Sequence, residues 1–416
     1  MKNKSGYNRF LLLWSGELIS AIGGGLTAFG LGVYVFNMTG SAGSMALVSL
    51  LAFLPTLLLS APAGVLADRC DRRLLMMLGD GLSALGLVYI LICMMTGGAE
   101  LYQICIGVCV SSVFSSLLEP AYRATITDLL TPEEYSKASG MVSLAGSARY
   151  LISPLLAGLL LSVADARLLL VIDIGTFFLT VLCTAAVRKG LEMEPTERAE
   201  PFRKSFRTGW EAVTGNRGVL ILILVSSVIT CFMGAMQILS EPMILSFADS
   251  RTLGIAETVC ASGMLFSGFY LGMRGIKGGY VRTLWISLAA AGAAMVGFGW
   301  REDLIVVCVF GFLFFFMLPF SNSCLDYLVR TNISAARQGR AWGLISVLSQ
   351  LGYVVAYGTT GVLADGLAAG LHRTVGRGAA LVIMAAGVLL IAAAAALGII
   401  KSVRSLENNE KTAYLE

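Results

Sequence analysis

Long apolar runs recur along the whole chain, and they constrain the fold more than any other feature of the sequence. A helix of about 20 residues crosses the hydrocarbon core of a bilayer, and the runs reach that length. Backbone groups in lipid have no water to bind, so only helices and closed barrels can span it. The runs are continuous rather than alternating, which indicates helices. The mean hydropathy of +0.80 is far above what a soluble domain carries.

The runs predict an all-α membrane protein with twelve transmembrane helices. The expected spans are 10–36, 44–66, 74–96, 101–129, 136–163, 167–188, 217–240, 254–273, 280–299, 304–329, 340–364 and 377–400. A long polar stretch divides them into six and six. The predicted domains are an N-terminal six-helix bundle over 1–187, a cytoplasmic linker over 188–217, a C-terminal six-helix bundle over 218–400 and a solvated cytoplasmic tail over 401–416.

The distribution of basic residues predicts the orientation. An even number of spans places both termini on one side of the membrane. If that side is the cytoplasm, the inner segments hold 24 of the 30 Lys and Arg, the outer segments hold five, and Arg149 lies inside a span. Basic residues concentrate in cytoplasmic loops. The bias therefore predicts cytoplasmic termini and, for a bacterial chain, the cell inner membrane.

The two halves of the chain also resemble each other. The fifth span ends in SVAD at Ser162–Asp165 and the eleventh in VLAD at Val362–Asp365, an offset of 200 residues, and Gly158 matches Gly358 at the same offset. Together with six spans on each side of the linker, this echo favours two related bundles around a central cavity, as in parallel-repeat transporters.

Charge is concentrated in Gly64–Arg73, GVLADRCDRR, the predicted turn between spans two and three. One interpretation is a basic stop signal that only fixes topology. Asp68 and Asp71 contribute nothing to such a signal, however. A carboxylate in a tight turn can bind backbone N–H groups at a helix start or a nearby guanidinium group. Such contacts can form in one conformation and break in another, so the turn is also a candidate latch.

This turn resembles the loop signature of the major facilitator superfamily, Gly-x-Leu-Ala-Asp-Arg-x-Gly-Arg-Arg/Lys. The matching residues are Gly64, Leu66, Ala67, Asp68, Arg69, Arg72 and Arg73. Asp71 stands where the signature has Gly, a variant similar to the macrolide-efflux branch. Further segments resemble the macrolide-efflux and enterobactin-exporter type: Trp14, Ser20 and Gly23 in the first span, Thr39–Ala42, Pro132–Glu134 and Gly339–Arg340.

The resemblance implies transport by alternating access, with the turn as a gate. It implies that Asp68 contacts the start of the eleventh span and locks the outward-facing state, and that Arg72 pairs with Asp128. The expected gating residues are Gly64, Asp68, Arg69, Arg72, Arg73, Asp128, Gly339 and Arg340.

Three ionisable residues within spans are candidates for coupling transport to protons: Glu17, Glu119 and Arg149. At 1.5 Å per residue Arg149 lies about 20 Å from the inner surface, near mid-membrane. Charges at this depth are costly, so they indicate function by default. Two carboxylates near one guanidinium can exchange a proton. The alternatives are that Arg149 only neutralises one Glu, or that Glu119 pairs with Arg123 one turn on.

Three other acids in spans, Asp80, Asp173 and Asp326, are expected to be helix-packing or rim residues. The fifth span also carries a degraded form of the family's antiporter signature. Its residues are Gly140, Ser153, Pro154, Ala157 and Gly158. Pro and small residues favour a pliable, closely packed helix. Many proton-coupled members of the family carry Arg in the fourth span, where this sequence has Ser111.

Enzymatic chemistry is not expected. The only His is His372, the nine Cys lack metal-ligand spacing, and the chain has no phosphate-binding loop of the ATPase type. We expect no metal, no cofactor and no nucleic-acid partner. An ion gradient is then the expected energy source.

The predicted function is a proton-coupled exporter of amphipathic, macrolide-like small molecules. Aromatic and Met-rich stretches at Cys231–Leu239 and Phe310–Phe320 suit apolar solutes, although such stretches more often face lipid or the core. The expected partners are the substrate, protons and membrane lipids, and the expected state is a monomer. The alternatives are a siderophore or lysolipid transporter on the same fold, or a membrane sensor or scaffold that transports nothing.

Overall fold

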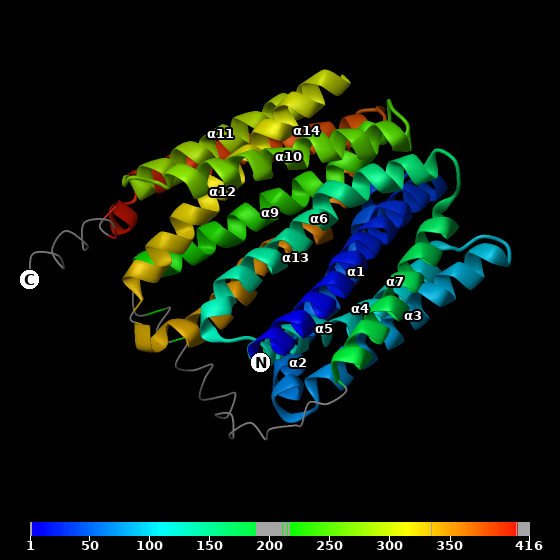
Figure 1. Ribbon diagram of the computed structural model, residues 1–416. Helices are drawn as coiled ribbons and strands as arrows, with labels where there is room; N and C mark the ends of the chain where they lie inside the picture. Colours follow the sequence, from blue (N-terminus) through cyan, green and yellow to red (C-terminus); the bar gives the residue numbers. More distant parts are fainter. Residues whose placement is uncertain are drawn as a thin grey trace, which may run out of the picture. The chain divides into compact units, whose positions relative to one another are not determined.

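The computed structural model describes residues 2–188, 210, 214, 217–333, 335–404 and 406, and the side chains of these residues apart from 2–5, 132, 136 and 334–343. Helices make up nearly all of this part of the chain (Figure 1). Within it, twelve helical segments are long and apolar enough to cross a membrane, as predicted. Most of the expected linker, 188–217, and of the tail, 401–416, lies outside the described residues.

The helices follow the predicted runs with small shifts at their ends. In the first half they are α1 (Lys2–Thr39), α2 (Ala42–Arg69), α3 (Arg72–Met95), α4 (Leu101–Ser115), α5 (Leu118–Leu129), the short 3₁₀ helix η1 (Pro132–Glu134), α6 (Tyr135–Leu161) and α7 (Ala166–Arg188). In the second half they are α9 (Arg217–Leu245), α10 (Ser250–Arg274), α11 (Tyr280–Trp300), α12 (Leu304–Asn332), α13 (Ala335–Gly370) and α14 (Val375–Ile399).

The fourth predicted span, 101–129, is broken into α4 and α5 at Ser116 and Leu117. Pro120 has no backbone N–H, so the Ser116 carbonyl loses its helical partner, and the Pro ring crowds that carbonyl. The Leu117 amide accordingly turns to the Phe114 carbonyl, three residues back, at 3.1 Å. Hydropathy alone could not show this break, because both pieces lie in one apolar run.

The chain forms two compact units. The first contains Met1–Gly40, Leu47–Ala199 and Ser250–Ile255, and the second contains Ser41–Ala46, Glu200–Asp249 and Ala256–Glu416. The first turn of α2 therefore belongs to the second unit and the first turn of α10 to the first.

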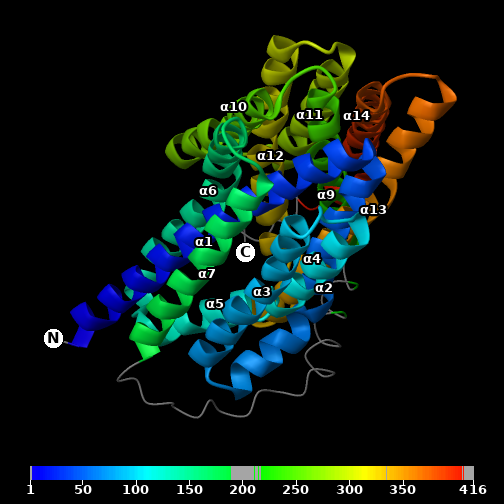
Figure 2. The ribbon, with the colours of Figure 1, turned by 90° about the vertical axis from the view of Figure 1, so that its right-hand side faces the viewer.

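The same packing order occurs inside both units. In the first unit α1 packs on α6 and α7, and α3 packs on α4 and α7 (Figure 2). In the second unit α9 packs on α13 and α14, and α11 packs on α12 and α14.

A pair of serine contacts repeats in the same way. Ser83 of α3 and Ser115 of α4 place their hydroxyls 2.8 Å apart, and Ser287 of α11 and Ser321 of α12 do the same at 2.8 Å. The two halves of the chain therefore resemble each other more clearly in helix packing than in sequence.

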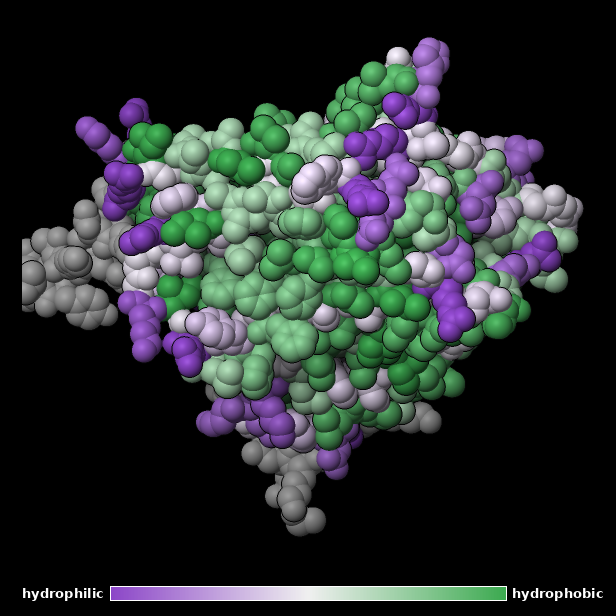
Figure 3. Space-filling view, turned by 90° about the horizontal axis from the view of Figure 1, so that it is seen from above, coloured by the Kyte–Doolittle hydropathy of each residue, from purple (hydrophilic) through white to green (hydrophobic). Residues whose placement is uncertain are grey.

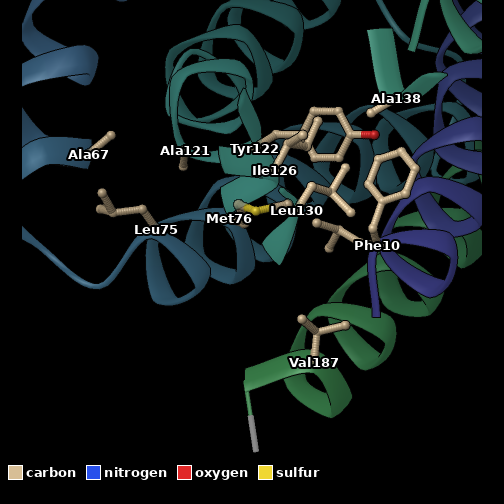
Figure 4. Packing of buried hydrophobic residues seen from close by; sticks show 11 residues of the cluster. Phe10, Ala67, Leu75, Met76, Ala121, Tyr122, Ile126, Leu130, Ala138 and Val187 are labelled. Carbon is tan, nitrogen blue, oxygen red and sulfur yellow. The ribbon is translucent and has the colours of Figure 1, made fainter. Parts of the chain in front are cut away.

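The helices of the first unit meet in an apolar core close to the α2–α3 turn. Side chains from α1, α2, α3, α5, α6 and α7 pack together there (Figure 4). Phe10 and Met76 are fully buried in it, and Ala67 belongs to the charged segment Gly64–Arg73. This core fixes the helix ends on either side of the α2–α3 turn.

Large apolar side chains remain exposed along the helices. Phe178, Leu182 and Leu58 are each more than half exposed, and apolar residues cover most of the face in Figure 3, with hydrophilic residues toward its margins. A soluble protein rarely exposes such an area, whereas lipid covers it without cost.

The described start of the tail departs from the expectation of a solvated segment. Val403 and Leu406 are buried. A Cβ on Gly218 would lie 2.7 Å from Cδ2 of Leu406, so Leu406 packs directly on the first turn of α9. The apolar side chain of Leu406 explains the difference, because burial removes it from water.

Candidate functional site: a charged turn and a line of membrane acids

The turn between α2 and α3 is built around Asp71. One oxygen of its carboxylate, Oδ1, accepts hydrogen bonds from the backbone amides of Arg73 at 3.1 Å and Leu74 at 3.5 Å, so Asp71 is the N-cap of α3. The other oxygen, Oδ2, accepts a bond from Nε of Arg188 at the end of α7, at 2.8 Å. A carboxylate at a helix start is favoured by the cap and by the helix dipole.

The pair between Arg72 and Asp128 that the resemblance implied is present. The Arg72 guanidinium donates to the Asp128 carboxylate at the end of α5 and to the Ala67 carbonyl at 3.2 Å. Arg73 approaches the same carboxylate at 3.7 Å and is itself buried, with its Nε lacking a partner within the described structure. The two arginines thus tie the start of α3 to the end of α5.

Asp68 is exposed and, in the described part of the chain, has no hydrogen-bond or ion-pair partner. Its expected partners, Gly339 and Arg340, fall on α13, but their side chains lie outside the described residues. A Cβ at Gly64 would meet nothing within 4 Å. Arg69 is exposed. The anchored carboxylate of the turn is Asp71, and the latch role of Asp68 stays a prediction.

The antiporter-type residues of α6 lie on two different packing faces. Ser153 is buried and donates to the Ile22 carbonyl of α1 at 3.0 Å. A Cβ on Gly158 would lie 2.7 Å from the Ser250 carbonyl oxygen, so α6 meets the first turn of α10 backbone to backbone. Ala157 is fully buried. Gly140, by contrast, has open space where a Cβ would be.

The run Gly23–Gly25 brings α1 close to both of its neighbours. A Cβ on Gly23 would lie 2.7 Å from Oδ1 of Asp173 on α7, and a Cβ on Gly25 would overlap the Ser153 hydroxyl on α6. Small residues permit such close approach between membrane helices. The glycines therefore place the Asp173 carboxylate directly against the backbone of α1.

Of the expected coupling residues, Glu119 forms the plain pair with Arg123 that was the competing interpretation. Its Oε1 lies 2.9 Å from Nε of Arg123, and both side chains are 68% exposed. Arg149 is exposed and makes no ion pair with a described residue. Glu17 interacts electrostatically with Glu119, and its Oε2 is buried without a partner among the described residues. The expected group of three is thus not a single bonded cluster within the described structure, because Glu119 forms its ion pair with Arg123.

Two of the acids expected to be packing or rim residues are deeply buried, which agrees with packing between helices. Asp80 of α3 is 2% exposed and Asp173 of α7 is 1% exposed. The charges of Asp173 and Glu17 both act on Asp80. Asp326, in contrast, is partly exposed and pairs with Arg330 at 2.8 Å.

The sequence interpretation missed a second acidic pair in the other unit. Glu241 of α9 and Glu257 of α10 are half-buried and interact electrostatically. The sequence does contain a signal for this pair, because each of the two acids stands in or at the end of a long apolar run. No three His, Cys, Asp or Glu side chains of the described residues are grouped so that they could hold a metal ion.

The Met-rich stretch of α9 lies against two tyrosines of α13. The Tyr353 hydroxyl lies 3.1 Å from Sδ of Met233, the Tyr357 hydroxyl donates to Oε1 of Gln237 at 3.1 Å, and the two rings are 5.7 Å apart. All four side chains are half-buried. This α9–α13 surface combines polarisable sulfur, aromatic rings and one amide, which suits large amphipathic solutes.

The sequence profile of the Major Facilitator Superfamily matches residues 13–357, most of the twelve-helix region. The chain belongs to this superfamily. It is a multi-pass membrane protein and a transporter of small molecules rather than an enzyme, as predicted.

The chain is similar to two efflux proteins of the superfamily. The chain is 25% identical to macrolide efflux protein A of Streptococcus pyogenes over 367 residues, 86% of this chain and 89% of that protein. It is 23% identical to the multidrug efflux pump Tap of Mycobacterium tuberculosis over 390 residues, 90% of each protein.

Solved transporters share the fold. A bacterial homologue of the human lysosomal transporter Spinster, in an inward-facing and unoccupied conformation, has a TM-score of 0.75, 14% identity and coverage of 97% of this chain and 98% of its own. The nucleoside transporter NupG has a TM-score of 0.73, 14% identity and coverage of 95% and 100%.

Proposed function

We propose that this transporter exports amphipathic, macrolide-like compounds from the bacterial cell in exchange for protons. The observation that carries the proposal is the likeness to two efflux proteins over 86–90% of the chain. The α9–α13 surface of Met233, Gln237, Tyr353 and Tyr357 supports it, because polarisable and aromatic groups bind large apolar solutes with few directional demands.

The transporter works as a monomer in the inner membrane, with both termini in the cytoplasm. The excess of Lys and Arg in the segments on that side supports the orientation. The two units open the substrate site alternately to each side. The α2–α3 turn, where Asp71 and Arg72 are already anchored, then serves as the fixed base of a latch to which Asp68 contributes the movable contact.

A drug-susceptibility panel tests the proposal. Cells that express the transporter should need higher concentrations of macrolides and of amphipathic dyes for growth inhibition than cells that express an equal amount of Asp68→Asn. Equal susceptibility of both strains and of cells without the protein, across the whole panel, would refute export and favour a membrane sensor or scaffold.

A further inference from the structure

The turn between α10 and α11 is basic and contains no acid that could balance its charge. Arg274 ends α10, Lys277 lies in the turn, Arg282 lies in the first turn of α11, and all three side chains are exposed. The sequence has no Asp or Glu between Glu257 and Glu302. Within the described structure, none of the three cations forms an ion pair. We call Arg274, Lys277 and Arg282 the basic turn.

The α2–α3 turn of the first unit neutralises its cations within the protein. There Arg72 and Arg73 lie against the Asp128 carboxylate, and Asp71 caps α3. The N-cap of α11 is instead Gly279, in a left-handed conformation with a φ of 67°, and no side chain caps that helix. The positive end of the α11 dipole therefore adds to the charge of the basic turn, whereas a carboxylate offsets the dipole of α3.

The acid that helix packing brings toward the start of α11 already has a partner. The rings of Tyr280 on α11 and Tyr327 on α12 stack with their centroids 3.6 Å apart, and Asp326 adjoins Tyr327 in the chain. Oδ2 of Asp326 accepts a hydrogen bond from Nε of Arg330 at 2.8 Å. Among the described residues, no carboxylate is thus left for the basic turn.

An exposed apolar side of α10 leads to the basic turn. Gly263 and Ser267 mark the packed side of this helix: a Cβ on Gly263 would lie 2.9 Å from a backbone nitrogen of α12, and Ser267 is fully buried. Phe266, Phe269 and Met273 share another side, at spacings of three and four residues, and are 62%, 69% and 64% exposed. In a membrane-spanning helix such a side meets acyl chains.

Arg274 joins the charged turn to this apolar side. Its guanidinium carbon lies 5.8 Å from the ring centroid of Tyr270, one helical turn earlier on α10. Basic side chains near the ends of membrane helices lie along apolar surface and keep their charge at the membrane–water interface. A guanidinium group in that position presents a planar set of N–H donors that matches the geometry of a phosphate.

We propose that the basic turn binds the headgroup of an anionic phospholipid and that the exposed side of α10 receives its acyl chains. The lipid phosphate accepts hydrogen bonds from the guanidinium and ammonium groups, and its negative charge balances theirs. A zwitterionic lipid binds less well, because its own ammonium group is repelled by the same cations. This inference concerns lipid binding and does not depend on export. With the proposed orientation, the lipid belongs to the cytoplasmic leaflet.

The test is native mass spectrometry of the purified full-length protein, released from maltoside micelles that contain equal amounts of phosphatidylglycerol and phosphatidylethanolamine with the same acyl chains. The wild type should retain phosphatidylglycerol in preference. The combined variant Arg274→Gln, Lys277→Gln and Arg282→Gln should weaken this binding by about tenfold or more. The control variant Arg251→Gln, Arg301→Gln and Arg373→Gln loses the same charge from exposed positions elsewhere, and it should bind as the wild type.

A second arm separates a lipid from a soluble anion. Inorganic phosphate in excess should leave the bound phosphatidylglycerol in place, because phosphate has no acyl chains to contact α10. Displacement by phosphate would contradict the proposal and indicate a site for a soluble anion.

Two further results would overturn the proposal: equal retention of both lipids by the wild type, or equal loss of phosphatidylglycerol from the basic-turn variant and the control variant. The latter would show a general effect of net charge. If the combined variant fails to fold, Lys277→Gln alone decides, since this exposed residue lies between the helices. It should weaken phosphatidylglycerol binding, and unchanged binding would refute the site.

Discussion

Arg188, the last residue of α7, donates from Nε to Oδ2 of Asp71 at 2.8 Å, while Oδ1 of the same carboxylate caps α3. The residue that departs from the superfamily signature therefore has two structural functions. It completes the first turn of α3, and it joins the α2–α3 turn to the end of the sixth span of the first unit.

Replacing Asp71 should separate these two functions. Asp71→Ala removes the cap and the ion pair, and we expect it to lower the free energy of unfolding by about 1–2 kcal/mol. Asp71→Asn keeps the cap and loses only a pair whose Arg188 side is 44% exposed, so it should cost less than about 1 kcal/mol. Thermal unfolding in detergent measures both. Equal loss in the two variants would show that the cap does not contribute.

Asp68→Asn should reduce transport without reducing insertion. If the latch forms, the substitution weakens a charge-assisted hydrogen bond of about 1.5–3 kcal/mol, which corresponds to roughly tenfold or more in transport rate. The measurement is dye efflux at equal membrane abundance. Asp165→Asn is the matched control, since Asp165 is also exposed and pairs only locally with Arg167. Normal efflux by Asp68→Asn would contradict the latch.

Two glycines of α6 should respond in opposite directions to the same change. Gly158→Ala places a Cβ 2.7 Å from the Ser250 carbonyl oxygen and 3.2 Å from Cα of Gly254, both of them backbone atoms. It should destabilise the protein by about 1–3 kcal/mol through overpacking. The Cβ added in Gly140→Ala has no other atom within 4 Å, so this substitution should leave the unfolding free energy unchanged or raise it by up to about 1 kcal/mol. Thermal unfolding of both variants checks the prediction, and a stable Gly158→Ala would contradict the close packing.

Asp365 should contribute more to the stability of the protein than Asp165, which occupies the matching position in the first half of the chain. Its carboxylate accepts bonds from the Ser41 hydroxyl at 2.6 Å and from the amides of Ala42 and Gly43, each at 2.9 Å, all within the second unit.

Asp365→Ala leaves these donors unpaired, so we expect a loss of about 1–3 kcal/mol in unfolding free energy. Asp165→Ala should cost less than about 1 kcal/mol, because the Asp165 carboxylate binds, among the described residues, only the amide and side chain of Arg167. Thermal unfolding in detergent compares the two variants. Equal losses of unfolding free energy would show that the hydrogen bonds from Asp365 to the start of α2 do not stabilise the protein.

Much of the fold could be predicted because hydropathy reports directly on which segments cross a bilayer. All twelve spans and the α2–α3 turn were placed in this way, and the pair of Arg72 with Asp128 followed from the resemblance. The break at Ser116 required the backbone consequence of Pro120, which an apolar run does not display.

The candidate site was less predictable. Whether an acid is exposed or buried depends on how its helix is rotated against its neighbours, and apolarity on all sides of a membrane helix hides that rotation. For Asp80 and Asp173 the sequence left a helix-packing position and a rim position open, and burial of both side chains agrees with packing; the acidic pair of Glu241 and Glu257 was overlooked. The anchoring by Asp71 was foreseen only as one option for a carboxylate in a turn.

Proton-driven export is the central claim, and everted membrane vesicles test it most directly. Acidifying the vesicle lumen should drive ethidium into vesicles that contain the transporter, and a protonophore should abolish the accumulation. Vesicles that contain the protein but accumulate no more dye than empty-vector vesicles, or that accumulate it equally with and without the proton gradient, would contradict the account.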